Sequence, residues 1–429
     1  MITLLILTFV MGYACIIAEE MIKINKAAIA LLTGVLCWTI YILSNHNAQV
    51  VENQLVVKFS EAAELLFFLL GAMALVEVID AHDGFDIIIS RLTTRRKASF
   101  LLLITVFTFF LSAILDNLTT TIVMVSFVRK LIGDREERLR LVGMIIIAAN
   151  AGGAWSPMGD VTTTMLWIGG QVTAWELVKH VFLPSVACVI VPLLLILPKF
   201  KGHITFIETS NTDISNIKNT LSQRHQYMAF FVGIGGLLFV PIFKTITHLP
   251  PFMGMLLSLG SVWTITELMH SHKNATERDA LSVKTALERV DTPSILFFVG
   301  ILLAVGALEV TGILRGIAVG LSHIIQNPLI ISIILGLVSA VFDNVPLVAA
   351  SMGMYDITIF HQDHAFWHFM AYCAGTGGSL LIIGSAAGVA AMGMERIDFL
   401  WYLKNITWLA TMGYVAGCAV FLLEHIFFT

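Results

Sequence analysis

Apolar runs of about 20 residues recur from one end of this 429-residue chain to the other. Such runs are expected to be helices, because the hydrocarbon core of a bilayer, about 30 Å thick, offers the backbone no hydrogen-bond partner. Hydrophobic residues make up 57% of the chain and charged residues 13%, and the mean hydropathy is +0.88. These values lie far from those of soluble proteins. We therefore predict an all-α polytopic membrane protein.

Ten runs are long enough to cross the membrane, and two further apolar stretches remain. The spans are predicted at residues 2–18, 27–44, 62–79, 141–170, 176–198, 227–243, 252–268, 293–310, 365–394 and 400–424. A polar stretch between the fifth and sixth spans is typical of a linker. We expect a first half at 1–198, a cytoplasmic linker at 199–226 and a second half at 227–429.

Basic residues predict the orientation. Of the 25 Lys and Arg residues, 20 lie at Arg396 or in the loops at 19–26, 80–97, 129–140, 199–226 and 271–291. An excess of basic residues marks the cytoplasmic side of a membrane protein, so both termini are expected outside. Compact loops favour a bacterial inner (plasma) membrane with periplasmic termini, and an organelle of bacterial descent is the alternative. The net charge of -4 and the scattered basic residues predict no nucleic-acid partner.

The two remaining apolar stretches are predicted to be re-entrant hairpins. Residues 98–132 have basic residues at both ends, and only 11 residues separate the Asp-Asn pair at 116–117 from Arg129. Eleven helical residues span about 17 Å, which is too short to cross the bilayer again. Residues 329–355 lie between outside loops and carry an Asp-Asn pair at 343–344. We expect the first hairpin to enter from the cytoplasm and the second from outside.

Short matching segments predict that the two halves are repeats. The matches are LFFLLG at 66–71 with LFFVG at 296–300, SAILDN at 112–117 with SAVFDN at 339–344, and GG at 152–153 with GG at 377–378. Because each half has five spans, an odd number, the second copy must be inverted relative to the first. Inverted repeats are the usual basis of alternating access around a site near the bilayer midplane.

Both hairpin tips carry oxygen-bearing side chains in otherwise apolar surroundings. They are Asp116, Asn117 and Thr119 at the first tip and Asp343 and Asn344 at the second. Such oxygens are the ligands that hard cations prefer, and removal from water favours the protonated form of a carboxyl group. A proton and a small cation are therefore expected to compete for these acids. The alternative interpretation is a helix cap in a loop outside the membrane.

The fourth and ninth spans are interrupted. Residues 150–164 contain three glycines, a proline and an acid, and residues 375–385 contain glycines and hydroxyls but no acid. Unwound backbone at membrane depth is tolerated where it lines a cavity. We predict cation or proton ligands in both breaks, with simple packing kinks as the alternative. The candidates are Asn150, Asp160, Thr162, Thr163 and Thr164 in the first break and Ser379 and Ser385 in the second.

The sequence gives little support for catalysis. No HExxH motif is present, and the five cysteines show no CxxC spacing, so we expect neither a cofactor nor a zinc site. An aspartyl dyad of Asp116 and Asp343 in an intramembrane hydrolase is one alternative, and a channel is another. The prediction is a secondary transporter, not an enzyme.

Four segments resemble the NhaD-type sodium/proton antiporters of the ion transporter superfamily, which also contains arsenite pumps and dicarboxylate/sodium symporters. They are SAILDNLTTT at 112–121, residues 150–167, DNVPL at 343–347 and residues 375–388. The dicarboxylate relatives carry Ser-Asn-Thr at their hairpin tips, where this chain has built-in acids. This difference argues against the alternative of an anion, arsenite or dicarboxylate carrier.

The resemblance implies exchange of sodium or lithium for protons, two hairpins, two broken helices, and a homodimer in the lipid membrane. It also implies a scaffold part and a mobile transport part. The ion-site positions carried over by the resemblance are Asp116, Asn117, Thr119, Asn150, Asp160, Thr162, Thr163, Asp343, Asn344 and Ser379.

Overall fold

The computed structural model describes residues 2–45, 47–85, 94, 96–203, 223–270, 281–355 and 357–428. In this part of the chain the regular elements are helices, and one isolated bridge pairs Arg96 with His203. Eight of the described helices are long and apolar enough to cross a membrane. The prediction of an all-α, multi-pass membrane protein is confirmed.

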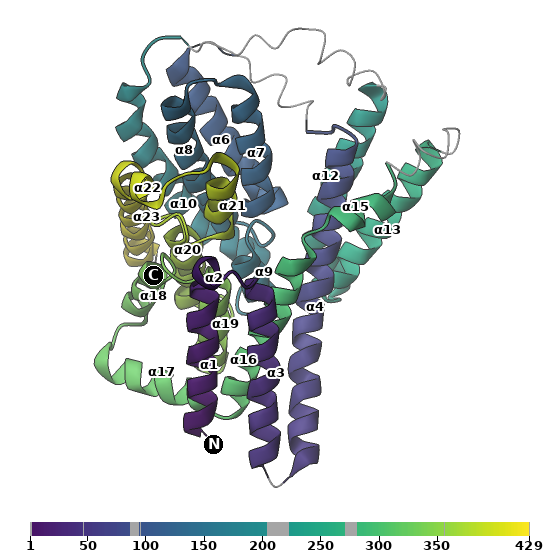
Figure 1. Ribbon diagram of the computed structural model, residues 1–429, viewed down its shortest axis with the longest axis vertical. Coiled ribbons are helices and arrows are strands. Elements are labelled where there is room, and N and C mark those ends of the chain that lie inside the picture. Colours follow the sequence, from purple (N-terminus) through teal and green to yellow (C-terminus); the bar gives the residue numbers. More distant parts are fainter. Residues whose placement is uncertain are drawn as a thin grey trace.

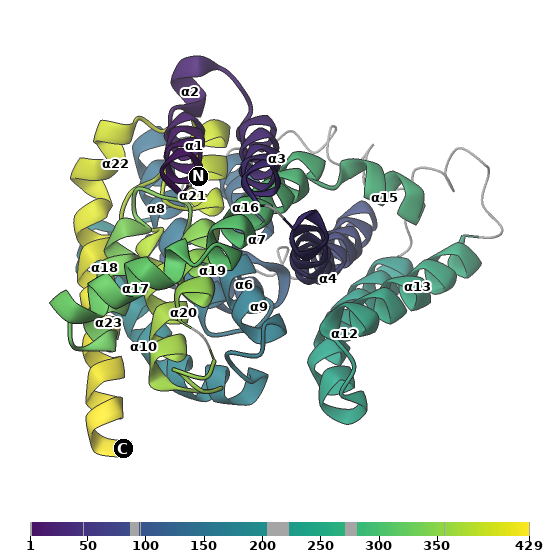
Figure 2. The ribbon, with the colours of Figure 1, turned by 90° about the horizontal axis from the view of Figure 1, so that it is seen from below.

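The helices pack as two groups, and Figure 2 shows part of the first group, residues 48–81, 223–269 and 283–289, standing beside the second. The first, called the support group below, consists of α1 (Ile2–Ile17), α2 (Glu19–Ile22), α3 (Lys26–Ser44), α4 (Ala48–Ala81), α12 (Gln223–Thr247), α13 (Pro251–Met269), α15 (Val283–Arg289) and α16 (Thr292–Val310). Within it, α3 packs closely along α16, and α13 packs against α4 and α12.

The second, called the hairpin group below, contains both predicted hairpins and both interrupted spans. It consists of α6 (Lys97–Leu115), α7 (Asn117–Leu131), α8 (Arg135–Ala154), α9 (Val161–Ile168), α10 (Ala174–Ile196), η1 (Leu197–Lys199), α18 (Pro328–Val338), α19 (Asn344–Met354), α20 (Ala365–Gly377), α21 (Ala386–Glu395), α22 (Phe399–Asn405) and α23 (Thr407–Phe428). The main contacts between the two groups join α16 to α19 and α4 to α9.

Helix ends coincide with the predicted tips and breaks. The first hairpin turns at Asp116, between α6 and α7, and the second turns between Val338 and Asn344. The fourth span is unwound from 155 to 160, between α8 and α9, and the ninth from 378 to 385, between α20 and α21. In Figure 1, α6, α7 and α8 lie together near the top, and α18 to α20 lie below them.

Corresponding positions of the two halves make corresponding contacts. The hydroxyl of Ser112 donates to the carbonyl of Ala149 at 2.6 Å, and the hydroxyl of Ser339 donates to the carbonyl of Ala374 at 2.9 Å. In both cases a hairpin arm is tied to the helix that precedes a break. The arms α6 and α18 also pack along α8 and α20, respectively.

Glycine allows these arms to approach closely. A Cβ placed on Gly152 would lie 2.2 Å from the carbonyl oxygen of Phe109, and one on Gly377 would lie 2.1 Å from the carbonyl oxygen of Gly336. Both distances are far below a normal contact, and the obstacle is backbone. A side chain at either glycine would therefore push the hairpin arm away from the broken helix.

Several elements differ from the predictions, among them one long helix and one short helix. Helix α4 begins at Ala48, whereas the span was predicted to begin near residue 62. The prediction is late because the first half of the helix carries charged residues, which lower the local hydropathy. One of them, Lys58, pairs with Glu61 at 2.9 Å. Helix α17 (Ile313–Ile324) was not expected, since its 12 residues are too few to cross a bilayer. Figure 1 shows α17 lying across the bundle at its lower end.

Candidate cation-binding site

Asp160 is the point at which both hairpin tips meet the first broken helix. It precedes α9, is 2% exposed, and accepts hydrogen bonds from the backbone N–H and hydroxyl of Thr162 at 2.9 and 3.0 Å. Its Oδ2 also accepts from the side-chain amides of Asn117 at 3.0 Å and Asn344 at 3.2 Å. A buried carboxylate needs such donors because it has lost its water. The two amides come from opposite halves of the chain.

Asn150 extends this network to the second broken helix. Its side-chain oxygen accepts from Asn117 at 3.0 Å. Its amide nitrogen donates to the hydroxyls of Ser379 and Ser385, both at 2.9 Å. Asn150 is fully buried, and the two serines are 3% and 2% exposed. The second break, at residues 378–385, contains no acid but contributes two hydroxyls to the same cluster.

Asp116 caps the second arm of the first hairpin. Its carboxylate accepts from the backbone N–H and the hydroxyl of Thr119, both at 2.8 Å. Its backbone has φ 105° and ψ 159°, a region that is almost confined to glycine and that costs other residues about 1–3 kcal/mol. Strain of this kind persists only where surrounding contacts impose it. Asp116 therefore makes a capping contact and also belongs to the lining of the cavity described below.

Asp343 caps the second arm of the second hairpin without such strain. Its backbone lies at φ -52° and ψ 134°, and its carboxylate accepts from the backbone N–H of Val345 at 3.2 Å. The other carboxylate oxygen lies 3.6 Å from the ammonium of Lys26, at the start of α3. Lys26 belongs to the support group, so this ion pair crosses between the two groups.

A cavity of about 70 Å³ lies between the two groups and collects these charges. Four charged side chains line it, namely Asp116, Asp160, Asp343 and Lys26. Apolar side chains of α4 and α16 form the opposite wall. Within the described ranges, no three His, Cys, Asp or Glu side chains form a group that could hold a metal ion. The acids therefore surround the cavity without converging on one point.

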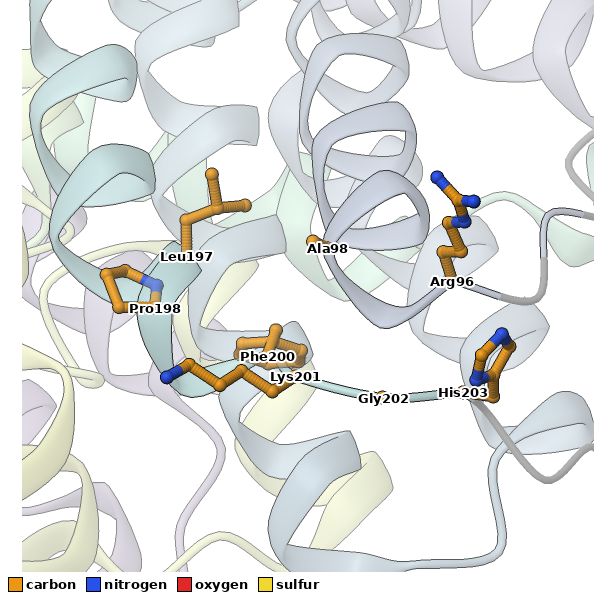
Figure 3. A pocket seen from close by; sticks show the side chains of 8 residues that line it. All are labelled: Arg96, Ala98, Leu197, Pro198, Phe200, Lys201, Gly202 and His203. Carbon is orange, nitrogen blue, oxygen red and sulfur yellow. The ribbon is translucent and has the colours of Figure 1, made fainter.

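A larger hollow of about 510 Å³ lies elsewhere, beside the start of α6 (Figure 3). Its lining residues are Arg96, Ala98, Leu197, Pro198, Phe200, Lys201, Gly202 and His203. None of them is an acid or a predicted ligand. Size alone would select this hollow, although the predicted ligands lie at the smaller cavity.

Most of the predicted residues lie in the one network or at its edge. Thr163 differs, because its hydroxyl donates to the backbone carbonyls of Ser156 and Asp160 at 2.7 and 2.9 Å and so holds the unwound segment in shape. Thr164 does the same, from its position at the cavity wall, with the carbonyls of Pro157 and Asp160. The sequence pattern does not single out Lys26, because it lies in the basic loop at 19–26.

Long apolar helices, with chain breaks that bring Asp116, Asp160 and Asp343 to one cavity, are typical of a multi-pass membrane transporter. The comparisons with known proteins agree. Residues 13–375 match the family model described as "Citrate transporter" (CitMHS). "Sodium/proton antiporter 1" of Arabidopsis thaliana is 49% identical over 98% of this chain and 72% of that protein, and "Na(+)/H(+) antiporter NhaD" of Vibrio cholerae is 31% identical over 99% and 92%. The chain belongs to this transporter family, among the NhaD-type sodium/proton antiporters, and is not an enzyme.

The fold also resembles a solved structure. The crystal structure of the Alcanivorax borkumensis YdaH transporter matches with a TM-score of 0.56, 10% sequence identity and 90% coverage of each chain. Identity this low makes the match a statement about the fold alone.

Proposed function

We propose that this protein exchanges cytoplasmic sodium or lithium for external protons by alternating access. The observation that carries the proposal is the buried Asp160 carboxylate, which receives amide donors from both hairpin tips. A carboxylate without water favours a proton or a cation as its partner. If the carboxylate binds either a proton or a sodium ion but not both, one site can carry the two ions in opposite directions.

The ligand set follows from the same cluster. We assign cation and proton binding to Asp116, Asn117, Thr119, Asn150, Asp160, Thr162, Thr163, Asp343, Asn344 and Ser379. For Thr163 the contribution is indirect, since its hydroxyl is already engaged by backbone carbonyls. Carboxylate, amide and hydroxyl oxygens suit a hard monovalent ion.

A carrier of citrate, another dicarboxylate or arsenite is the second candidate, favoured by the description of the matching family model. Such an anion would meet three acids and one lysine in the cavity. Like charges close to an anion in a site of low dielectric oppose its binding. The balance of charges supports a cation.

The proposed architecture is ten spans and two re-entrant hairpins in two inverted repeats, 1–198 and 227–429, joined by the linker at 199–226. The matched contacts of Ser112 and Ser339 support the repeat. We further propose a homodimer in a bacterial inner membrane, with both termini periplasmic. The alternative is an organelle of bacterial descent, because two of the relatives come from the plant Arabidopsis thaliana.

Everted membrane vesicles test the exchange. Proton movement on addition of sodium, lithium or potassium is followed with a pH-sensitive dye, and citrate is added in a parallel series. We expect sodium and lithium to release protons from acidified vesicles and citrate to have no effect. Citrate uptake without cation-driven proton movement would replace the proposal with the second candidate.

Single cysteines test the topology. Cysteines placed at Arg96 and Arg129 should react only from the cytoplasm, and those at Gln326 and Gln362 only from outside. Labelling of positions 96 and 129 from opposite sides would turn the first hairpin into two spans. The inverted arrangement would then fail.

A further inference from the structure

Lys26 lies at a helix N-terminus beside the second hairpin tip. It is the first residue of α3, whose N-cap is Asn25, and its backbone N–H donates to Glu19 at 2.9 Å. The N-terminal end of a helix carries partial positive charge and disfavours a further cation. The ammonium is instead directed to two partners, the Asp343 carboxylate at 3.6 Å and the ring of Phe297, whose centroid is 4.7 Å away.

The pair joins helices that otherwise belong to different groups. Lys26 and Phe297 lie on α3 and α16, which pack closely together in the support group. Asp343 lies at the tip of the second hairpin, next to Phe342, whose ring is 5.3 Å from that of Tyr13 on α1. The ammonium therefore reaches from the support group to the hairpin group. The pair persists only while the two groups keep this relative position.

Charge in the cavity gives the pair a role beyond packing. Among its described lining residues, Lys26 is the one cation, set against Asp116, Asp160 and Asp343. The Lys26 and Asp343 side chains are 28% and 21% exposed, so screening by water is incomplete. An ammonium beside Asp343 neutralises one carboxylate of the cavity. A sodium ion arriving there would offer the same single positive charge.

We propose that Lys26 is a tethered cation that occupies Asp343 while the site holds no sodium, so that a sodium ion must displace it to bind there. This proposal rests on the proposed function and adds a competitor built into the chain. Only the partner of Lys26 changes. Lys26 belongs to the support group and Asp343 to the hairpin group. When sodium binds at Asp343, the ion pair between the two groups is therefore lost.

If Lys26 competes with sodium, its removal should increase the affinity for sodium. Removing a residue that merely supports the site weakens sodium binding or leaves it unchanged. Removing a competitor strengthens binding. For Lys26→Met we expect the sodium dissociation constant to fall roughly fivefold, the size of one partly exposed ion pair. Lys26→Arg keeps the charge and should stay close to the wild type.

Sodium binding to the purified full-length protein provides the test. The dissociation constant is taken from sodium-dependent thermal stabilisation at one alkaline pH, with choline chloride keeping the ionic strength constant. The matched control is Lys23→Met, which removes an exposed lysine from the same turn. We expect Lys26→Met to bind sodium more tightly and Lys23→Met to match the wild type.

A double substitution localises the competition. In an Asp343→Asn background the partner is absent, so Lys26→Met should no longer tighten sodium binding as it does in the wild-type background. Equal or weaker sodium affinity of Lys26→Met in the otherwise unchanged protein would overturn the proposal. Failure of the wild-type protein to bind sodium at all would instead refute the proposed function, which keeps the two failures distinct.

Discussion

The two hairpin tips carry the same Asp-Asn pair but use it differently. Both asparagines donate to Asp160. The two aspartates diverge, because Asp116 is strained and held by Thr119, whereas Asp343 is unstrained and faces Lys26. Among the described residues Asp116 has no ion pair. Two hairpin tips with the same Asp-Asn pair can therefore use their amides alike, as donors to Asp160, while their two carboxylates make different contacts.

The largest expected effect comes from the residue that both tips contact. Asp160→Asn keeps the shape of the side chain but removes the charge that must alternate between proton and cation. Exchange in everted vesicles should fall on the order of 100-fold, as expected when a buried charged hydrogen-bond partner is lost. The control is Asp134→Asn at the exposed cap of α8. Exchange near the wild-type level would show that the tips do not meet at the transport site.

The next effect separates the two acids. Asp116→Asn and Asp343→Asn should both lower exchange strongly, though by less than Asp160→Asn, while the protein still inserts in the membrane. Sodium binding should weaken less in Asp343→Asn, by roughly fivefold relative to Asp116→Asn, because this substitution also removes the ion pair with Lys26 that sodium must otherwise break. Titration of both purified variants with sodium measures this difference. Equal sodium affinities would mean that Lys26 does not distinguish the tips.

The amides test what the tips share. Asn117→Ala removes donors to both Asn150 and Asp160, whereas Asn344→Ala removes donation to Asp160 alone. Each should weaken sodium binding about tenfold, the effect of one hydrogen bond to a charged group, and Asn117→Ala should have the larger effect. A stronger effect of Asn344→Ala would reverse the assignment of the central amide.

The smallest effect concerns the acid-free break. Ser379→Ala and Ser385→Ala each remove one neutral hydrogen bond from Asn150. Such a bond contributes about 1 kcal/mol, so sodium affinity should change about fivefold or less in either variant. The double variant tests whether the serines act on the same amide. A loss as large as that of Asp160→Asn would make a hydroxyl, not the carboxylate, the main ligand.

The local sequence pattern predicted the helices and the acids of the candidate site better than it predicted which side chains from different helices lie in contact. Asp116, Asp160 and Asp343 stand out because acids in apolar runs are costly and therefore conspicuous. Lys26 does not stand out, since a lysine at the end of a span is ordinary and no local pattern states which hairpin tip lies beside it. Helix α17 was missed because hydropathy selects long runs, and a helix lying across the bundle needs only one apolar side.

Proton release on sodium binding tests the central claim most directly. Purified protein in weak buffer receives sodium without any gradient, and the pH change is recorded together with the sodium dissociation constant at several pH values. Where the carboxyl group is protonated, sodium affinity should fall about tenfold for each unit of decreasing pH, and it should level off at alkaline pH. Each sodium bound in the falling range should release one proton, and Asp160→Asn should release none. Sodium affinity that stays constant from about pH 6 to pH 9, with no proton released, would contradict competition of the two ions for these carboxylates.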